Sequence, residues 1–300
     1  MNISSQGFAN QYINNLQILQ TNNLYYMNQT GSGHKFQTPS EAPSDASMVL
    51  RAQTSRMQIG QCLKNGAYAQ GLANIASQTI EKMMENNSDI GAYSVQYSSL
   101  NVDALKNIRS TIDGLLDQMV NLANTKQMDT FLFGGNKLTQ EPFKVSRDEV
   151  TNRIDKIEYV GGEDVNTFSI GPNLSLNPLT EASENEQIKA ALDNLLALRD
   201  AFYEEPPDSN KVRILGNSVN QDNETIFADI LGSLGAKLTR IEHAEQQNQF
   251  INEDLEKISS LYADINVVDV IVKFQQSQFA YQAALQTGSK VLNLSLLNYL

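Results

Sequence analysis

The last 34 residues of the chain carry a long, regular apolar pattern. Ten positions follow one another at alternating steps of four and three, and seven of them are apolar. This spacing puts them on one stripe of a helix about nine turns long. So narrow a stripe is typical of a coiled-coil or bundle seam, because a globular helix buries a broader face. The ten positions are Val267, Ile271, Phe274, Gln278, Tyr281, Leu285, Gly288, Leu292, Ser295 and Tyr299.

Charged residues are scarce at both ends of the chain. Lys35 is the only one among positions 1–40, and Lys273 and Lys290 are the only ones after position 270. An exposed helix normally carries Glu and Lys on its outer face. Like charges repeated around a symmetric assembly would instead repel one another or lie desolvated. We therefore predict that both ends belong to a packed assembly; the alternative is a pair of disordered polar tails.

The same four-three rhythm recurs between the two ends. It runs from Met48 to Met83, from Leu105 to Leu122 and from Phe227 to Ile265, and a weaker stripe passes through Leu16 and Leu19. Residues 140–180 instead alternate between apolar and polar side chains, as in short strands. The expected fold is mainly α, a long antiparallel helical bundle or coiled coil formed by both chain ends, with a small inserted α+β domain.

Local signals suggest where the elements begin and end. Ser44 is the expected N-cap of the second helix, and residues 86–91 are the expected bend before the third. Residues 183–186 have a capping-box pattern that would open a short helix, which Pro206-Pro207 would stop. Residues 208–225 have no clear pattern. The expected domains are 1–43 with 266–300 as terminal assembly segments, 44–140 with 226–265 as a helical bundle, and 141–225 as the inserted domain.

Composition and motifs argue against an enzyme. The formal net charge of −12 and the pI near 4.6 argue against nucleic acid or an anionic membrane as partner. Neither histidine has metal-ligand spacing, and Cys62 is the single cysteine. The Gly288-Ser289-Lys290 triplet lacks the upstream glycine of a phosphate loop. We therefore predict no catalytic residue, cofactor or metal. With no signal-peptide pattern and no membrane span, the chain would be called cytoplasmic on these signals alone.

Several short motifs, in order along the chain, resemble one family. Ser32-Gly33-His34-Lys35-Phe36 is followed by Pro39-Ser40 and Pro43, and Leu122-Ala123-Asn124 by Phe131-Leu132-Phe133-Gly134-Gly135. Gly235-Ala236-Lys237-Leu238 precedes a long helix, and the chain ends in Leu294-Ser295-Leu296-Leu297-Asn298-Tyr299-Leu300. Together they resemble the bacterial flagellin superfamily, and most closely its hook–filament junction proteins, the third hook-associated proteins. Glu41-Ala42 and Asn266 depart from this pattern, in which aspartates are usual.

The resemblance implies a structural role outside the cell. Such proteins are exported by the flagellar type III apparatus without a cleaved signal. Their terminal segments are typically disordered in the monomer and order on assembly. Implied partners are further copies of the chain in a ring, the first hook-associated protein, flagellin, and a cytoplasmic export chaperone at the C-terminal helix. The predicted assembly contacts are Leu16, Leu19, Phe274, Tyr281, Leu285, Leu292 and Leu296.

Two other functions remain open on the sequence alone. A minor or short flagellin would share the helical ends, although Pro39, Pro43 and the Tyr299-Leu300 ending favour a junction protein. A secreted coiled-coil effector or adhesin would keep its function without the last 30 residues. The predicted contacts could also pack within one chain rather than between copies.

Overall fold

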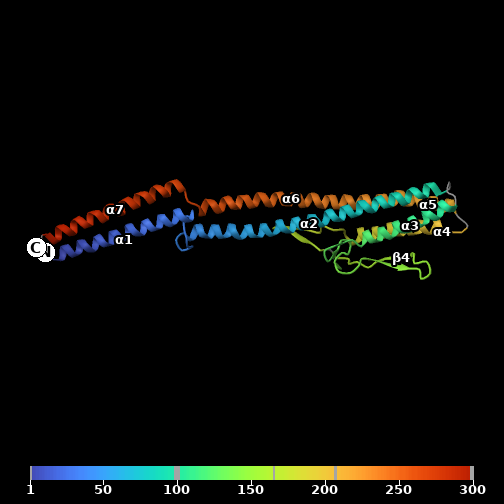
Figure 1. The fold of residues 1–300 in the computed structure, drawn as a ribbon, viewed down its shortest axis with the longest axis horizontal. Helices are drawn as coiled ribbons and strands as arrows, with labels where there is room; N and C mark the ends of the chain where they lie inside the picture. Colours follow the sequence, from blue (N-terminus) through green and yellow to red (C-terminus); the bar gives the residue numbers. More distant parts are fainter. Residues whose placement is uncertain (1, 98–101, 165, 206–207, 298–300) are drawn as a thin grey trace. The chain divides into compact units, whose positions relative to one another are not determined.

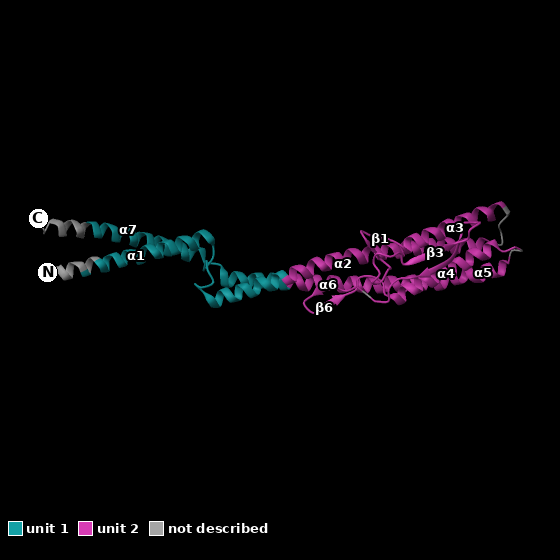
Figure 2. Ribbon diagram, turned by 90° about the horizontal axis from the view of Figure 1, so that it is seen from below, with its two compact units in different colours: residues 1–57, 251–300 teal, residues 58–250 magenta. Residues whose placement is uncertain are grey.

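The computed structural model describes residues 2–97, 102–164, 166–205 and 208–297. The chain divides into two compact units, residues 1–57 with 251–300 and residues 58–250, which Figure 2 colours separately. The helices are α1 (Asn2–Ser32), α2 (Pro43–Gln96), α3 (Val102–Ala123), α4 (Ala182–Tyr203), α5 (Ser209–Ser218), the π-helical segment η2 (Val219–Asn223), α6 (Glu224–Ala263) and α7 (Val267–Leu297). The strands are β1 (Lys126–Gln127), β2 (Thr130–Phe131), β3 (Phe143–Arg147), β4 (Ile154–Tyr159), β5 (Phe168–Gly171) and β6 (Leu174–Leu176). The predicted mainly-α fold with a small β-containing insertion is confirmed.

The first unit consists of two antiparallel helix pairs. The terminal helices α1 and α7 lie side by side, and the start of α1 and the end of α7 lie at the same end of that pair (Figure 1). The start of α2 pairs with the end of α6. There the guanidinium of Arg56 donates to the Asn252 side chain at 3.3 Å and to the Glu256 carboxylate at 3.2 Å. The expectation that the terminal segments order only on assembly stays a prediction.

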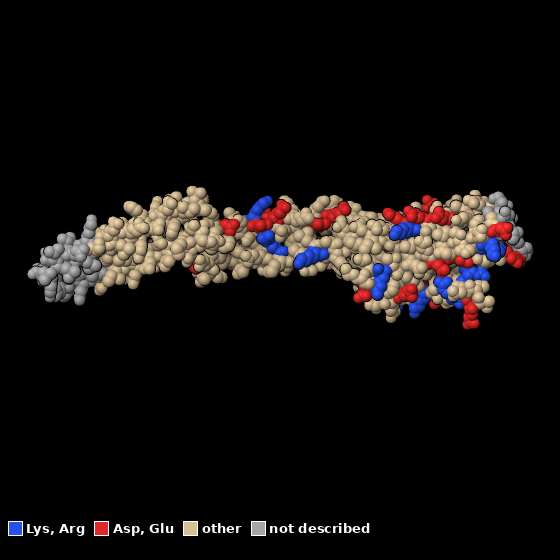
Figure 3. Space-filling view, viewed as in Figure 1, with Lys and Arg blue, Asp and Glu red and all other residues tan. Residues whose placement is uncertain are grey.

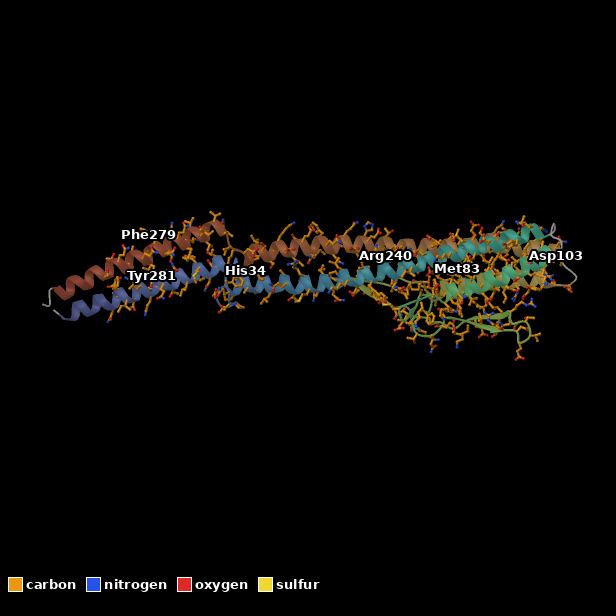
Figure 4. All side chains as sticks on the ribbon, in the orientation of Figure 1. His34, Met83, Asp103, Arg240, Phe279 and Tyr281 are labelled. Atoms are coloured by element: carbon orange, nitrogen blue, oxygen red, sulfur yellow. The ribbon has the colours of Figure 1, made fainter. Side chains whose placement is uncertain are left out.

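The second unit is held together by one large apolar cluster. It gathers side chains from α2, α3, α4, α5, η2, α6 and the strands, and Figure 4 labels Met83, one of its fully buried members. Each such side chain contributes about 1.5–3 kcal/mol relative to an exposed one. The largest fully buried side chains include Phe133, Phe143, Phe202 and Phe227. The insertion is therefore packed onto the helices through a shared core.

The strands form three separate antiparallel hairpins. β3 pairs with β4, β5 with β6, and β1 with β2. Within residues 140–180, where the sequence predicts short strands, the alternating stretches at 156–160, 167–170 and 174–176 form β4, β5 and β6. β3 was not predicted individually. Its sequence signal is the alternation of Phe143 and Val145 with polar neighbours. In the structure, Phe143 pairs with Tyr159 of β4 and Val145 with Ile157.

Residues 208–225 have no predicted structure. In the structure they form α5 and η2, which lead without interruption into α6. Asp208 caps α5, and its carboxylate accepts from the backbone N–H groups of Asn210 and Lys211. Within η2, the side chain of Asn223 donates to Asn87 at 2.9 Å, and Asn87 donates to the Val219 carbonyl at 2.9 Å. These asparagines are buried and hydrogen-bonded to each other, so they fix how α2 meets η2.

Three predicted helix signals are wrong in position. α2 runs through residues 86–91 without a bend, because Asn87 and Gly91 there face η2. Ser44 lies inside α2, since Pro43 takes the first helical position, where a missing N–H costs nothing. The capping box of α4 is made by Glu181 and Glu184, two residues before the predicted start.

Gly135 is expected to tolerate no side chain. Its φ is +60°, and a Cβ there would lie 2.3 Å from the carbonyl oxygen of Gly162. We expect Gly135→Ala to lower the free energy of unfolding in urea by about 2 kcal/mol or more, from left-handed strain and steric conflict. Gly71→Ala is the matched control, because Gly71 lies exposed in α2 with open space around it. The control should raise stability by about 0.5–1 kcal/mol; an equal loss in both variants would contradict the argument.

Candidate assembly surface

The α1–α7 pair has a narrow seam. On α1 the inward-facing side chains recur at steps of four and three, and on α7 they do the same. The α1 seam contains Tyr12, Leu16, Leu19, Asn23 and Tyr26, all half-buried. The α7 seam contains Val270, Phe274, Ser277, Tyr281, Ala284 and Gly288, all buried or half-buried.

Small residues on α7 allow α1 to approach closely. The hydroxyl of Tyr12 donates to the backbone carbonyl of Ala284, and it lies 2.0 Å from where a Cβ on Gly288 would be. The hydroxyl of Ser277 is buried in the same seam without a partner in the described part of the chain. The seam is thus closely packed near Gly288, but part of it is polar and unsatisfied.

The predicted α7 stripe is wrong at alternate positions. Phe274, Tyr281 and Gly288 lie in the seam as predicted, but Val267 is 54% exposed, Ile271 37% and Leu285 45%. Val270, Ser277 and Ala284 take the places of Ile271, Gln278 and Leu285 in the seam, one residue earlier in each case. At the Ala284–Gly288 end of the seam, the Tyr12 hydroxyl approaches the α7 backbone so closely that only small side chains fit there.

These displaced residues belong to an exposed apolar flank of α7. At about 100° per residue, its members all lie on one side of the seam. The apolar flank consists of Val267, Val268, Ile271, Val272, Phe279 and Leu285. Figure 4 shows Phe279 on the outer side of α7 and Tyr281 toward α1. On the opposite side, Asp269 and Lys273 form an ion pair at 2.7 Å. One side of α7 is therefore apolar and the other polar.

The seven predicted contact residues fall into three groups. Leu16, Leu19, Phe274 and Tyr281 are half-buried in the seam of one chain. Leu285 lies on the apolar flank. The side chains of Leu292 and Leu296 lie outside the described residues. The face in Figure 3 shows almost only uncharged side chains along the described part of α1 and α7.

Hydrogen bonds join the α1–α2 connection to the α6–α7 connection and so link the α1–α7 pair to the rest of its unit. The Lys35 N–H donates to the Ala263 carbonyl at 2.7 Å, and the Ile265 N–H donates to the Gly33 carbonyl at 3.0 Å. The His34 Nδ1 lies 3.2 Å from an Asp264 carboxylate oxygen, and Figure 4 labels His34 at this junction. Residues 32–35, the Ser-Gly-His-Lys stretch, therefore hold the α1–α2 connection against the α6–α7 connection.

The two departures from the family pattern have clear local roles. The side chain of Asn266 accepts from the N–H groups of Val268 and Asp269 at 3.2 and 3.3 Å, so it caps α7. Glu41 accepts from the Gln37 N–H at 3.1 Å, and this contact is the largest cause that lowers the pKa of its carboxyl. Both residues accept hydrogen bonds from backbone N–H groups, as an aspartate also could.

Within the described residues, no group of three or more His, Cys, Asp or Glu side chains is placed to hold a metal ion. None of the described helices is long and apolar enough to cross a membrane. The α1–α7 pair, with its exposed apolar flank, is therefore the strongest candidate for a functional surface.

Comparison with known proteins gives a fold and no sequence family. No protein-family model and no curated protein matches the sequence. Solved structures do match. A Vibrio parahaemolyticus protein assigned to the flagellar hook-associated proteins has a TM-score of 0.62 at 14% identity, over 74% of this chain and 99% of its own.

Two further solved structures carry junction-protein names. Bacillus cereus FlgL has a TM-score of 0.57 at 20% identity, over 70% of this chain and 99% of its own. The flagellar junction protein FlgL from Legionella pneumophila has a TM-score of 0.55 at 12% identity, over 73% of this chain and 99% of its own. At these identities the likeness establishes the fold. The structures are nevertheless from the group that the sequence motifs resemble, so that prediction is confirmed at the level of fold.

Proposed function

We propose that this chain is a structural subunit of the bacterial flagellum, forming a ring that joins the hook, through the first hook-associated protein, to the flagellin filament. The observation that carries the proposal is the α1–α7 pair, which is nearly free of charge and exposes an apolar flank. In a monomer this apolar surface would stay exposed to water, which is unfavourable, whereas a ring of copies can bury it between subunits. The shared fold of solved junction proteins supports the same assignment.

Assembly of this kind must be cooperative. Ordering each terminal residue costs about 1–2 kcal/mol in backbone entropy. The seam between α1 and α7 offsets this only in part, since it holds the small residues Ala284 and Gly288 and the unpaired Ser277 hydroxyl. Simultaneous contact with several neighbours offsets the rest, so subunits add to an existing end and do not polymerise in dilute solution.

The proposal also fixes partners and location. The neighbours are further copies of the chain, the first hook-associated protein and flagellin, and the site of action is extracellular. Export runs through the flagellar type III apparatus without a cleaved signal peptide. Before export, a cytoplasmic chaperone covers the C-terminal helix, whose apolar flank would otherwise promote aggregation. The role is not enzymatic, and no cofactor is involved.

Deleting the gene is expected to leave bare hooks on the cell surface and flagellin monomers in the medium. Export continues in such cells, but the filament lacks its adaptor. Electron microscopy of the surface and an assay of secreted flagellin measure both effects, and a plasmid copy of the gene is the control. Normal filaments after deletion would instead favour a minor flagellin or a secreted coiled-coil protein.

A further inference from the structure

Contacts near both ends of the α1–α7 pair show how its residues are matched. The Tyr12 hydroxyl donates to the Ala284 carbonyl and lies close to the α7 backbone one turn later. Further along α1, Tyr25 lies near Lys273: Asp269 is the main cause that raises the pKa of that lysine, and Tyr25 adds a smaller electrostatic contribution. In an antiparallel pair, each step forward along one helix is matched by one step back along the other. One register therefore holds between these two contacts.

Each helix carries three exposed side chains beside the seam, at steps of seven residues. A step of seven keeps them on one side of a coiled coil. Each follows directly after a seam residue, so it is turned from the seam by about 100° in the same sense. Because the helices run in opposite directions, this turn brings both sets to the same side of the pair. We call these six residues the two-helix face; in the pairs that the register places opposite one another, they are Ile13 and Leu285, Gln20 and Gln278, and Met27 and Ile271.

The two-helix face carries no charge. In a coiled coil that contains only two helices, positions beside the seam often hold Glu and Lys, which form ion pairs across it. Here four of the six residues are apolar, and these four are 37–51% exposed. Apolar residues beside the seam widen a narrow stripe into the broader face that is typical of a helix in a bundle. The α1–α7 pair therefore has one face that further helices are needed to cover.

The side chains that border the seam on its other side are polar. They include Asn15 and Asn22 on α1 and Lys273 and Thr287 on α7, and all four are exposed. Lys273 forms its ion pair with Asp269 there. The difference between the two sides shows that the apolar character of the two-helix face is local and is not a general property of these helices.

We propose that the α1–α7 pair of a second copy of this chain packs on the two-helix face. The partner surface must lack charge, because a charged side chain opposite this face would be desolvated without a partner. The ends of this chain meet that requirement, since Lys35 is the only charged residue among positions 1–40 and Lys273 and Lys290 are the only ones after position 270. The rest of the chain is strongly acidic. Asn and Gln side chains of the second copy can pair with the amides of Gln20 and Gln278.

The inference rests on the proposed function for the presence of a neighbouring copy, and it names the side of the α1–α7 pair that meets this neighbour. Ile271 and Leu285 also belong to the apolar flank, so the surface continues the one already assigned to assembly. The new element is α1, which supplies half of the two-helix face through Ile13, Gln20 and Met27.

Photo-cross-linking of the concentrated full-length chain tests the contact. Cys62→Ala removes the single native cysteine, which is buried, and Gln20→Cys then carries a benzophenone attached through a maleimide. Asn22→Cys is the matched control, because Asn22 is exposed on the same helix but borders the other side of the seam. On irradiation the label at position 20 should give at least tenfold more covalent dimer than the label at position 22. Mass spectrometry should place the cross-link within residues 1–40 or 267–300 of the second copy.

A second substitution tests the apolar part of the face. Met27→Asp in the chain labelled at position 20 should lower the yield of dimer at least tenfold. Met57→Asp should leave the yield unchanged, because Met57 is 69% exposed on α2, outside the α1–α7 pair. Equal yields from the labels at positions 20 and 22, cross-links outside the terminal helices, or equal losses in both Asp variants would overturn the proposal.

The cross-linking result is separate from that of the gene deletion, because it is measured on the purified chain. Bare hooks after deletion, without dimers through the two-helix face, would keep the proposed function and reject this contact. Normal filaments after deletion, with such dimers, would keep the contact between copies and reject the role at the hook.

Discussion

Leu285→Asp is expected to abolish incorporation into the flagellum while leaving the helical content of the monomer unchanged. Leu285 is 45% exposed on the apolar flank of α7, so a carboxylate there stays in contact with water in the monomer. On assembly the same carboxylate would be buried against a neighbouring copy without a partner, at a cost of several kcal/mol. That corresponds to a loss of roughly a hundredfold or more in affinity at each contact.

The measurement pairs two observations on the same variant. Far-UV circular dichroism follows the helical content of the purified chain, and electron microscopy counts hooks that carry filaments when the variant is expressed in cells that lack the gene. Thr287→Asp is the control, because Thr287 is also exposed on α7 but lies on the polar side, at the same helical angle as Asp269. It should restore filaments. Loss of helicity in Leu285→Asp would place that residue in an intramolecular core, and failure of both variants would mean that the apolar flank has no special role.

The helices could be predicted from the sequence because their pattern repeats many times. Each four-three stripe is sampled over several turns, so the existence of α2, α3, α6 and α7 does not depend on any single residue. The exact seam of α7 could not be predicted. Leu285 and Ala284 are neighbours in sequence, and the choice between them depends on Tyr12, which lies 272 residues from Ala284 along the chain. Contacts between distant residues leave no periodic signal.

The insertion shows the same limit. The glycine pairs at 134–135 and 161–162 are each typical of a turn. The structure brings them together, with the Gly162 N–H donating to the Gly134 carbonyl at 3.0 Å. The sequence of neither glycine pair indicates that it contacts the other. Predicting this contact would need the topology first.

Arg199→Ala is expected to lower the free energy of unfolding by about 3–5 kcal/mol, because it breaks a buried ion pair by removing one partner. Arg199 is 4% exposed in α4, and its guanidinium donates to the Asp113 carboxylate of α3 at 3.3 Å. It also donates to the Ile154 carbonyl of β4 and to Asp200. One side chain therefore fastens the β3–β4 hairpin to two helices.

Urea unfolding of the full-length chain measures this loss. The control is Arg240→Ala, because Arg240 is exposed and has no partner in the described residues; it should change the free energy of unfolding by less than about 0.5 kcal/mol.

A double-mutant cycle with Asp113→Ala separates the ion pair from the packing of Arg199. Since Asp113 also accepts from the Tyr203 hydroxyl at 2.6 Å, both single variants disturb one network. The double variant should therefore lose less than the two single losses combined, by about 0.5–3 kcal/mol. Additive losses would mean that Arg199 acts through its other contacts, and that the bond to Ile154 rather than the pair with Asp113 holds the hairpin in place.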